Sequence, residues 1–185
     1  EADLTPALQA LSNNGPNHQI RDPEALKRIK IEAKRLLKFI PKNSFLIKHS
    51  PAQCLALAYP ERVAQRRPGI QPHYIMANGK GVVLANDDGL ANAPFLVISE
   101  LGNSNHSSGP DPKIRRALSI SSDEIREIFG SQIKWLETCR WSKRARKVLS
   151  IQTESLGSIS LTSQNWPQVP TQKVSLAMLD GIKQI

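Results

Sequence analysis

The chain has 185 residues and a mass of 20.5 kDa, enough for one domain of good size or two small ones. Hydrophobic residues make up 39% of it and the mean hydropathy is -0.35, so a core can form. No run reaches the roughly 18 apolar residues of a membrane span, so we expect a cytoplasmic protein with no membrane partner. Because the chain starts at Glu1 and not at Met, we expect a segment of a longer protein.

The net charge is the main global signal. Twenty-five Lys and Arg against 16 Asp and Glu give +9, and a basic surface attracts polyanions, of which nucleic acid is the commonest. The excess lies upstream of residue 148, since residues 148–185 hold as many acids as bases. This uneven distribution favours a binding role over general solubility.

Several chemistries are not expected. Cys54 and Cys139 are too few for a disulfide framework, and we expect both to be small buried residues. The histidines have no Cys or carboxylate at ligand spacing, so no metal site is expected. Gly79-Lys80-Gly81 lacks the upstream Gly and the Ser or Thr of a phosphate loop, and its setting predicts a tight turn. Without a catalytic triad or carboxylate pair, we expect no catalytic residue and no cofactor on this chain.

The first third of the chain reads as helical. Asp22-Pro23 and Ser50-Pro51 both pair an N-cap residue with proline at the first helical position. Apolar residues at three- and four-residue steps predict an amphipathic helix from residue 23 to Pro41, with a basic outer face. We expect helical stretches at 6–11, 23–40 and 51–58, and a further helical turn at 61–67.

After Pro68-Gly69 the apolar pattern changes to that of strands. Asn78-Gly79 between two apolar runs predicts a hairpin of 74–77 and 82–84. Further strands are expected at 94–101 and 114–120, a helix from Ser121 or Ser122 to Gly130, and three antiparallel strands at 133–141, 145–153 and 156–163. Residues 102–112 have no apolar side chain and should form a mobile loop. The end of the chain predicts a helix at 171–185, with these side chains inward: Val174, Ala177, Met178 and Ile182.

This order predicts an α+β fold. N-terminal helices are followed by a small antiparallel β-barrel of the oligonucleotide-binding (OB) type, with one inserted helix and a C-terminal helix. The expected units are a helical segment at 1–58, the end of a helix-bundle domain; an OB-like β domain at 59–163; and a linker with the closing helix at 164–185.

Three basic groups are the candidate nucleic-acid contacts. A strand–turn–strand could grip phosphates while its tryptophan stacks on a base or, alternatively, turns into the barrel; this hairpin group is Arg140, Trp141, Lys143, Arg144, Arg146 and Lys147. A second group on an adjacent strand is Lys113, Arg115 and Arg116, where Arg116 interrupts the apolar alternation. A third at the junction of helices and barrel is Arg62, Arg66 and Arg67, which could instead pair with acids of a neighbouring domain.

Several segments resemble, in the same order, the C-terminal region of a family of bacterial ATP-dependent helicases related to the DEAH-box group. They include LALAYPERVAQRR at 55–67, YIMANGKGVVL at 74–84, LANAPFLVISEL at 90–101, KIRRALSI at 113–120, LGSISL at 156–161 and AMLDGIKQI at 177–185. Residues 1–49 resemble more loosely the end of the preceding helical bundle. The chain departs from the family pattern at three positions: Ser142 replaces an Asp, and Glu154-Ser155 replaces a pair of arginines.

The resemblance implies that ATP and Mg²⁺ bind to upstream RecA-like domains of the full-length protein and that this region closes over the strand. The expected partners are single-stranded nucleic acid, RNA more than DNA, and the upstream helicase core in cis. We therefore expect an accessory nucleic-acid-binding region. The alternative is a protein-interaction module that docks on the helicase core or another partner, and salt-dependent binding of single-stranded RNA separates the two.

Overall fold

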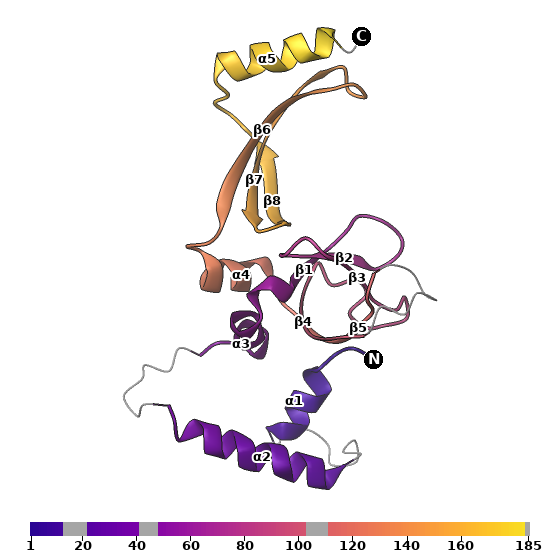
Figure 1. Cartoon of the computed structure of the whole chain (residues 1–185), viewed down its shortest axis with the longest axis vertical. Coiled ribbons are helices and arrows are strands. Elements are labelled where there is room, and N and C mark those ends of the chain that lie inside the picture. The colour runs from indigo at the N-terminus through magenta and orange to yellow at the C-terminus, as the bar shows by residue number, and fades with distance from the viewer. Residues whose placement is uncertain (13–21, 41–47, 103–110, 184–185) are drawn as a thin grey trace.

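The computed structural model describes residues 1–12, 22–40, 48–102 and 111–183 (Figure 1). The helices are α1 (Thr5–Leu11), α2 (Pro23–Leu37), α3 (Pro51–Ala58), α4 (Ser122–Phe129) and α5 (Thr171–Ile182), with a short 3-10 turn at Pro60–Arg62. The strands are β1 (Val63–Arg66), β2 (His73–Met76), β3 (Gly81–Val83), β4 (Phe95–Leu101), β5 (Ile114–Ser119), β6 (Lys134–Ser142), β7 (Lys147–Leu156) and β8 (Ile159–Asn165). The mixed helix and sheet composition predicted from the sequence is confirmed.

Five strands form one curled antiparallel sheet in the order β3-β2-β1-β4-β5, a half-barrel (Figure 1). The predicted hairpin is present as β2 and β3, with Gly79 at φ +86 in its turn. The outer strands approach each other where Val83 of β3 forms a parallel bridge with Lys113, just before β5. At the edge of β5, Ala2 and Leu4 exchange backbone hydrogen bonds with Ala117.

The expectation of a helical turn at 61–67 was wrong beyond Arg62. Residues Val63–Arg66 form β1, which lies at the centre of the sheet between β2 and β4. Four residues with two polar side chains carry almost no periodic signal, so only pairing with both neighbours decides that they are extended.

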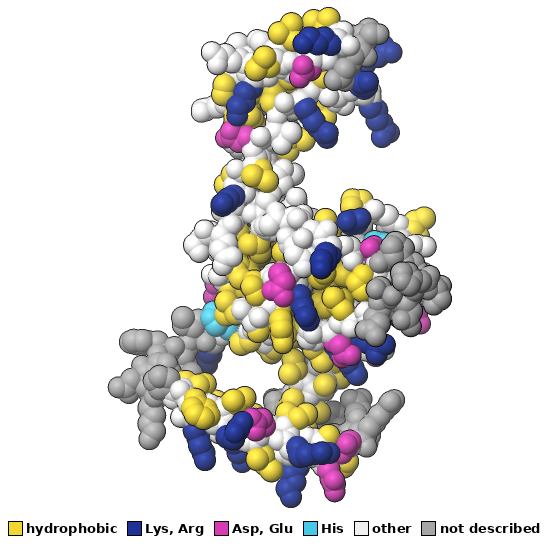
Figure 2. Space-filling view, in the orientation of Figure 1, with side chains coloured by type: hydrophobic (Ala, Val, Ile, Leu, Met, Phe, Trp, Pro, Cys, Tyr) yellow, Lys and Arg dark blue, Asp and Glu magenta, His cyan; other side chains and the backbone are white. Residues whose placement is uncertain are grey.

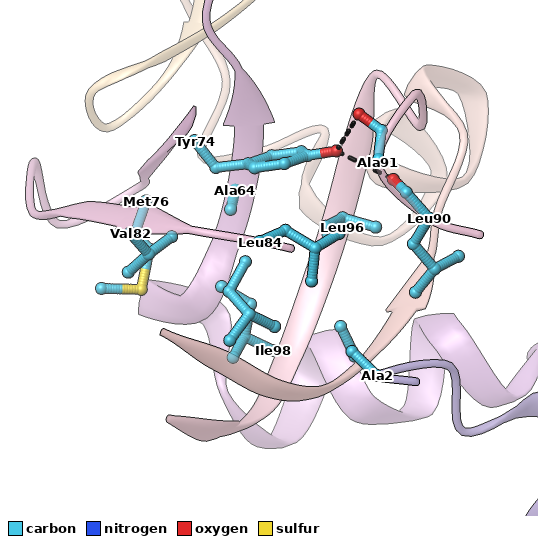
Figure 3. Close-up of a cluster of buried hydrophobic side chains, with 12 residues drawn as sticks. Ala2, Ala64, Tyr74, Met76, Val82, Leu84, Leu90, Ala91, Leu96 and Ile98 are labelled. Atoms are coloured by element: carbon cyan, nitrogen blue, oxygen red, sulfur yellow. Dashed lines mark hydrogen bonds between the residues drawn. The ribbon is translucent and has the colours of Figure 1, made fainter. Parts of the chain in front are cut away.

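The first half of strand β4, residues 95–98, is buried on both faces because the half-barrel packs on two sides. Leu96 and Ile98 face the inside of the half-barrel, where Tyr74 also lies (Figure 3). Phe95 and Val97 face a second core, formed with α3, α4 and the turn of β7 and β8. This explains why 94–101 reads as a continuous apolar run and not as an alternating one.

Helices α3 and α4 start side by side, and each has a capping box. Ser50 Oγ donates a 2.6 Å hydrogen bond to Glu124 Oε1, so the side chain that caps α4 is also bonded to the cap of α3. The hydrogen bond from Ser50, aided by two from Ser121, holds the pKa of Glu124 below its ordinary value, although burial opposes this. The helix start predicted at Ser50 is confirmed, and of the two residues predicted to cap the later helix, Ser121 and Ser122, it is Ser121.

The last three strands form a sheet of their own, in the order β6-β7-β8, and not part of the single small barrel that we expected. We call this sheet together with α5 the arm, because it projects from the half-barrel (Figure 1). Its base is fixed by Gln65, whose amide Nε2 donates to the Ser160 carbonyl oxygen at 2.6 Å and whose Oε1 accepts from the Ser160 N–H at 2.8 Å. The inserted helix, α4, packs against β4 of the half-barrel on one side and the turn of β7 and β8 on the other.

Arg126 of α4 forms the second fixed point of the arm. Its guanidinium contacts both carboxylate oxygens of Glu154 on β7, at 2.7 to 3.1 Å, and Asp123 at 2.8 Å. The hydrogen bonds to Glu154 raise the pKa of Arg126. Glu154, which stands where the family pattern has an arginine, therefore joins the arm to α4.

Some burial expectations were wrong. In α5 the inward residues are Ala177 and Gly181, whereas Met178 is 51% exposed and Ile182 is 68% exposed, because the helix lies across a narrow sheet that covers only its small-residue face. Cys54 is exposed on α3, and Cys139 is only partly buried. Helix α2 has no buried residue, although its apolar stripe predicts a covered face.

No helix in the described part of the chain is long and apolar enough to cross a membrane. The loop expected at 102–112 falls mostly on residues 103–110, which lie outside the described part of the chain.

Candidate nucleic-acid interface

The hairpin group lies at the far end of the arm, where β6 turns into β7. Lys143, Arg144, Arg146 and Lys147 are exposed there, and Figure 2 shows Lys and Arg side chains gathered at this end of the molecule. The turn is held by a 3.2 Å hydrogen bond from the Ala145 N–H to Ser142 Oγ. Arg146 has φ +48, a left-handed conformation that is unfavourable for a side chain with a Cβ atom.

Trp141 at the end of β6 is half-buried, and α5 covers one side of its indole ring. A Cβ atom added to Gly181 would lie 2.5 Å from Trp141 Cδ2, so the glycine of α5 packs directly on the indole ring. The sequence left two possibilities for this ring, stacking on a base or turning into the barrel. In the structure the ring packs against α5 and not inside a barrel. The tryptophan attaches the C-terminal helix to the arm.

The second group, which lies on β5 and on the residue just before it, lines a cavity of about 460 Å³. Lys113, Arg115 and Arg116 are exposed around it, and the acidic residues Glu1, Asp88 and Glu100 line the same cavity. The pairing of β4 with β5 shifts register on both sides of Glu100, which pairs with Arg116. This irregularity explains why the alternation of apolar residues in the sequence is interrupted at Arg116. Mixed charge makes this cavity less suited to a polyanion than the end of the arm.

The junction group is largely used within the fold. Arg62 donates to the Ser99 carbonyl oxygen at 2.8 Å, and its guanidinium lies 4.8 Å from the centre of the Tyr59 ring. Arg66 Nε donates to the Ala91 carbonyl oxygen at 2.9 Å. Arg67, next along the chain, is exposed. Two of the three arginines thus have structural partners.

The three groups are not brought together into one surface. The hairpin group is separated from the other two by the length of the arm (Figure 1). One exposed base missed by the sequence reasoning, Lys134, starts β6, which also carries Arg140. The alternation of side chains along the predicted strand 133–141 could have shown that Lys134 and Arg140 share a face.

Neither a phosphate loop nor a metal cluster is seen in the described part of the chain. Gly79-Lys80-Gly81 joins β2 to β3, and the Lys80 N–H is bonded to Asn78 Oδ1 at 3.0 Å, so the predicted tight turn is confirmed. No helix follows this turn, and its residues do not fit a nucleotide phosphate. Among the residues described, no three His, Cys, Asp or Glu side chains cluster closely enough to hold a metal ion.

The sequence and the fold of the chain are both similar to those of one known protein. No protein-family model matches the chain. The chain is 28% identical over 174 residues to the ATP-dependent RNA helicase HrpB of Escherichia coli (strain K12), a match that covers 94% of this chain and 20% of the helicase. Two crystal structures of E. coli HrpB, described as a DExH-box NTPase and a DEAH/RHA helicase, share its fold over the whole chain, with TM-scores of 0.64 and 0.63 at 23% and 19% identity. The chain spans about a fifth of each of these proteins.

The sequence match and the shared fold agree with the resemblance expected from the sequence. They also agree that only a small part of the relative is matched. The chain is therefore homologous to the helicase HrpB, and it has the fold of the C-terminal region of that protein.

Proposed function

We propose that this chain is the C-terminal accessory region of an ATP-dependent RNA helicase and that it binds single-stranded nucleic acid without catalysing a reaction itself. The observation that carries the proposal is the basic end of the arm, on a chain homologous to an RNA helicase. ATP and Mg²⁺ would bind elsewhere in the longer protein, which would act in the cytoplasm. We propose RNA and not DNA as the ligand because the relative is named an RNA helicase.

The charge of the arm supports a polyanion as the ligand. Between residues 131 and 185 there are eight Lys and Arg and three Asp and Glu, a difference of +5. Phosphate contacts by such bases release counterions and give affinity with little sequence preference. Of the sequence candidates, those on the hairpin are retained: Arg140, Lys143, Arg144, Arg146 and Lys147. The groups at 62–67 and 113–116 are weaker candidates because of their internal partners and acidic neighbours.

We further propose that the half-barrel is OB-like. Its first three strands form a meander, β1 pairs with β4, and β3 approaches the start of β5 in parallel through Val83 and Lys113. This connectivity is compatible with a small partly open Greek-key barrel.

Binding of labelled single-stranded RNA and DNA of one length, measured by filter binding across a salt series, tests the proposal. Four contacts from the hairpin would give a slope of log affinity against log salt of about −3 for a single strand. Replacing Arg144 and Lys147 by Glu should flatten that slope for all sequences alike. Affinity that is immeasurably weak at low salt, from a folded chain, would contradict the proposal.

A second function, docking on protein, is favoured by one specific observation. Helix α5 exposes Leu176, Met178, Leu179 and Ile182, each by 51 to 68%. Such a patch commonly marks a protein contact. In a longer protein that contains this chain, a photo-crosslinker at Leu179 should then attach to the helicase core, whereas one at Lys80, exposed in the turn of the half-barrel, serves as a control. Equal labelling of both positions would contradict docking through this patch.

A further inference from the structure

The two faces of the arm sheet differ in what covers them. Side chains alternate along β6, and Trp141, which contacts α5, fixes which residues face the helix. We call this the covered face; it includes Glu137, which lies 3.5 Å from Lys173 of α5. The opposite, open face is assigned by the same alternation and by the pairing register, which is regular throughout β6. It carries Lys134, Leu136, Thr138, Arg140 and Ser142 of β6, Lys147, Leu149, Ile151 and Thr153 of β7, and Ser163 and Asn165 of β8.

Hydrogen bonds between strands confirm this assignment. On the open face, Thr153 Oγ1 and Ser163 Oγ lie 2.9 Å apart. On the covered face, Gln152 reaches Glu137 at 3.5 Å and Gln164 reaches Gln152 at 3.4 Å. Each of these contacts joins residues that the register places on one side of the sheet.

Charge is divided between the two faces by sign. Both acids of the sheet, Glu137 and Glu154, are on the covered face, and each is paired, with Lys173 and with Arg126 respectively. The open face holds three bases and no acid. Lys134, Arg140 and Lys147 are all exposed, and none takes part in any ion pair found among the described residues. Their charge is therefore available to a ligand.

The spacing of these bases selects the kind of ligand. Lys134 and Arg140 are six residues apart on one strand, about 20 Å, and Lys147 lies opposite Ser142, about 7 Å further. Bases so far apart cannot converge on one phosphate, but they can meet successive phosphates of an extended chain. Thr138, Thr153 and Ser163 place hydroxyl groups between them. The open face has no aromatic side chain, so base stacking would not contribute there.

We propose that the open face of the arm binds the sugar–phosphate backbone of single-stranded nucleic acid, running along β6 from Lys134 past Arg140 to Lys147. This inference rests on the proposed function and names the surface that performs it. The tip residues Lys143, Arg144 and Arg146 extend the same row of positive charge. Because the contacts are with phosphates, recognition does not depend on base sequence.

The test uses the 185-residue chain with a fluorescent oligo(U) RNA and an oligo(dT) of equal length, in a salt series. The main variant replaces Lys134, Arg140 and Lys147 together by Gln. We expect its salt slope to be shallower by about 2, at about 0.7 for each lost contact, and its affinity at 0.1 M salt to fall by about tenfold or more. Arg140→Lys should retain most of the binding because it keeps the charge. Lys80→Gln, which removes an exposed base from the half-barrel, is the matched control and should bind like the wild type.

The outcomes separate this inference from the function on which it rests. If the triple variant, shown to be folded by its thermal melting, binds like the wild type, the open face is not the site, although RNA binding by the chain stands. If the wild type itself shows no salt-dependent binding, both proposals fail. Leu136 is 52% exposed at the centre of the open face, where a protein partner would bury its side chain but a phosphate backbone would not need it. Should Leu136→Ser weaken RNA binding as much as the triple variant, the backbone-contact model is overturned.

Discussion

Replacement of Tyr74 by Phe removes one hydroxyl group from the inside of the half-barrel and leaves the ring in place. Tyr74 is fully buried, and its Oη lies 2.9, 3.3 and 3.0 Å from the carbonyl oxygens of Leu90, Ala91 and Ala93 (Figure 3 shows the first two). A single hydroxyl hydrogen is shared among these three acceptors. The segment 90–93 leads into β4, so the hydroxyl fixes the start of a strand whose first half is buried on both faces.

The loss of stability in this variant depends on which hydrogen bonds the three carbonyl oxygens keep. The Leu90 oxygen also accepts from the Ala93 N–H at 3.0 Å, and the Ala91 oxygen accepts from Arg66 Nε at 2.9 Å. In the described part of the chain, the Ala93 oxygen has no other hydrogen bond. The variant therefore leaves one buried acceptor unsatisfied and not three, and we expect it to lower the free energy of unfolding by about 1–2 kcal/mol near neutral pH.

The pH dependence gives a second, independent signal. Burial raises the pKa of Tyr74 from 10.0 to about 12, with a further rise from Asp88 and an opposing effect of Arg66. Above pH 10 the unfolded phenol loses its proton while the folded one keeps it. The stabilisation is therefore complete below pH 10 and is lost as the pH rises towards 12, by up to about 2.7 kcal/mol for a shift of two pH units.

Urea unfolding of the wild type and of Tyr74→Phe, from pH 8 to pH 12, measures both quantities. Ionisation of the lysines affects both proteins and cancels in the difference. The wild type should be the more stable at pH 8, and the difference should shrink above pH 10 and reverse near pH 12. A difference that stays constant over the whole range would refute the assignment of a buried, protonated phenol.

The remaining predictions concern the arm and the helix starts. Arg126→Ala should cost about 2–3 kcal/mol, because the Glu154 side chain, 11% exposed, loses its partner, whereas Glu154→Ala should cost only about 1 kcal/mol; urea unfolding of both and of the double variant should show non-additive losses, and additive ones would exclude the coupling. Arg146→Gly should raise the free energy of unfolding by about 1 kcal/mol by relieving the left-handed backbone, and a lowered melting temperature would argue against strain there. Because the pKa of Glu124 is lowered, it stabilises the fold above its unfolded pKa, and this contribution is lost as the pH falls through the folded value. Ser50→Ala should cost about 1 kcal/mol near neutral pH and make the acid loss less steep; an unchanged acid profile would rule out this role.

Local signals in the sequence determined most of the secondary structure. The caps at Asp22, Ser50 and Ser121 and the Asn78-Gly79 turn each specify their geometry through contacts within a few residues. The net charge and the family resemblance likewise needed only residue identity and order. For the same reason, the bases of the hairpin could be named before their surroundings were known.

Tertiary structure alone decided how these elements are divided and what each base can reach. Strand β1 is extended because β2 and β4 pair with it, and the last three strands form a separate sheet whose base is held by α4 and Gln65. Long-range contacts also gave Arg62 and Arg66 their carbonyl partners and brought Gly181 onto the ring of Trp141. Such contacts join residues far apart in the sequence, so their energies leave no local pattern. The separation of charge between the two faces of the arm arises in this way, from strand register combined with the one-sided docking of α5.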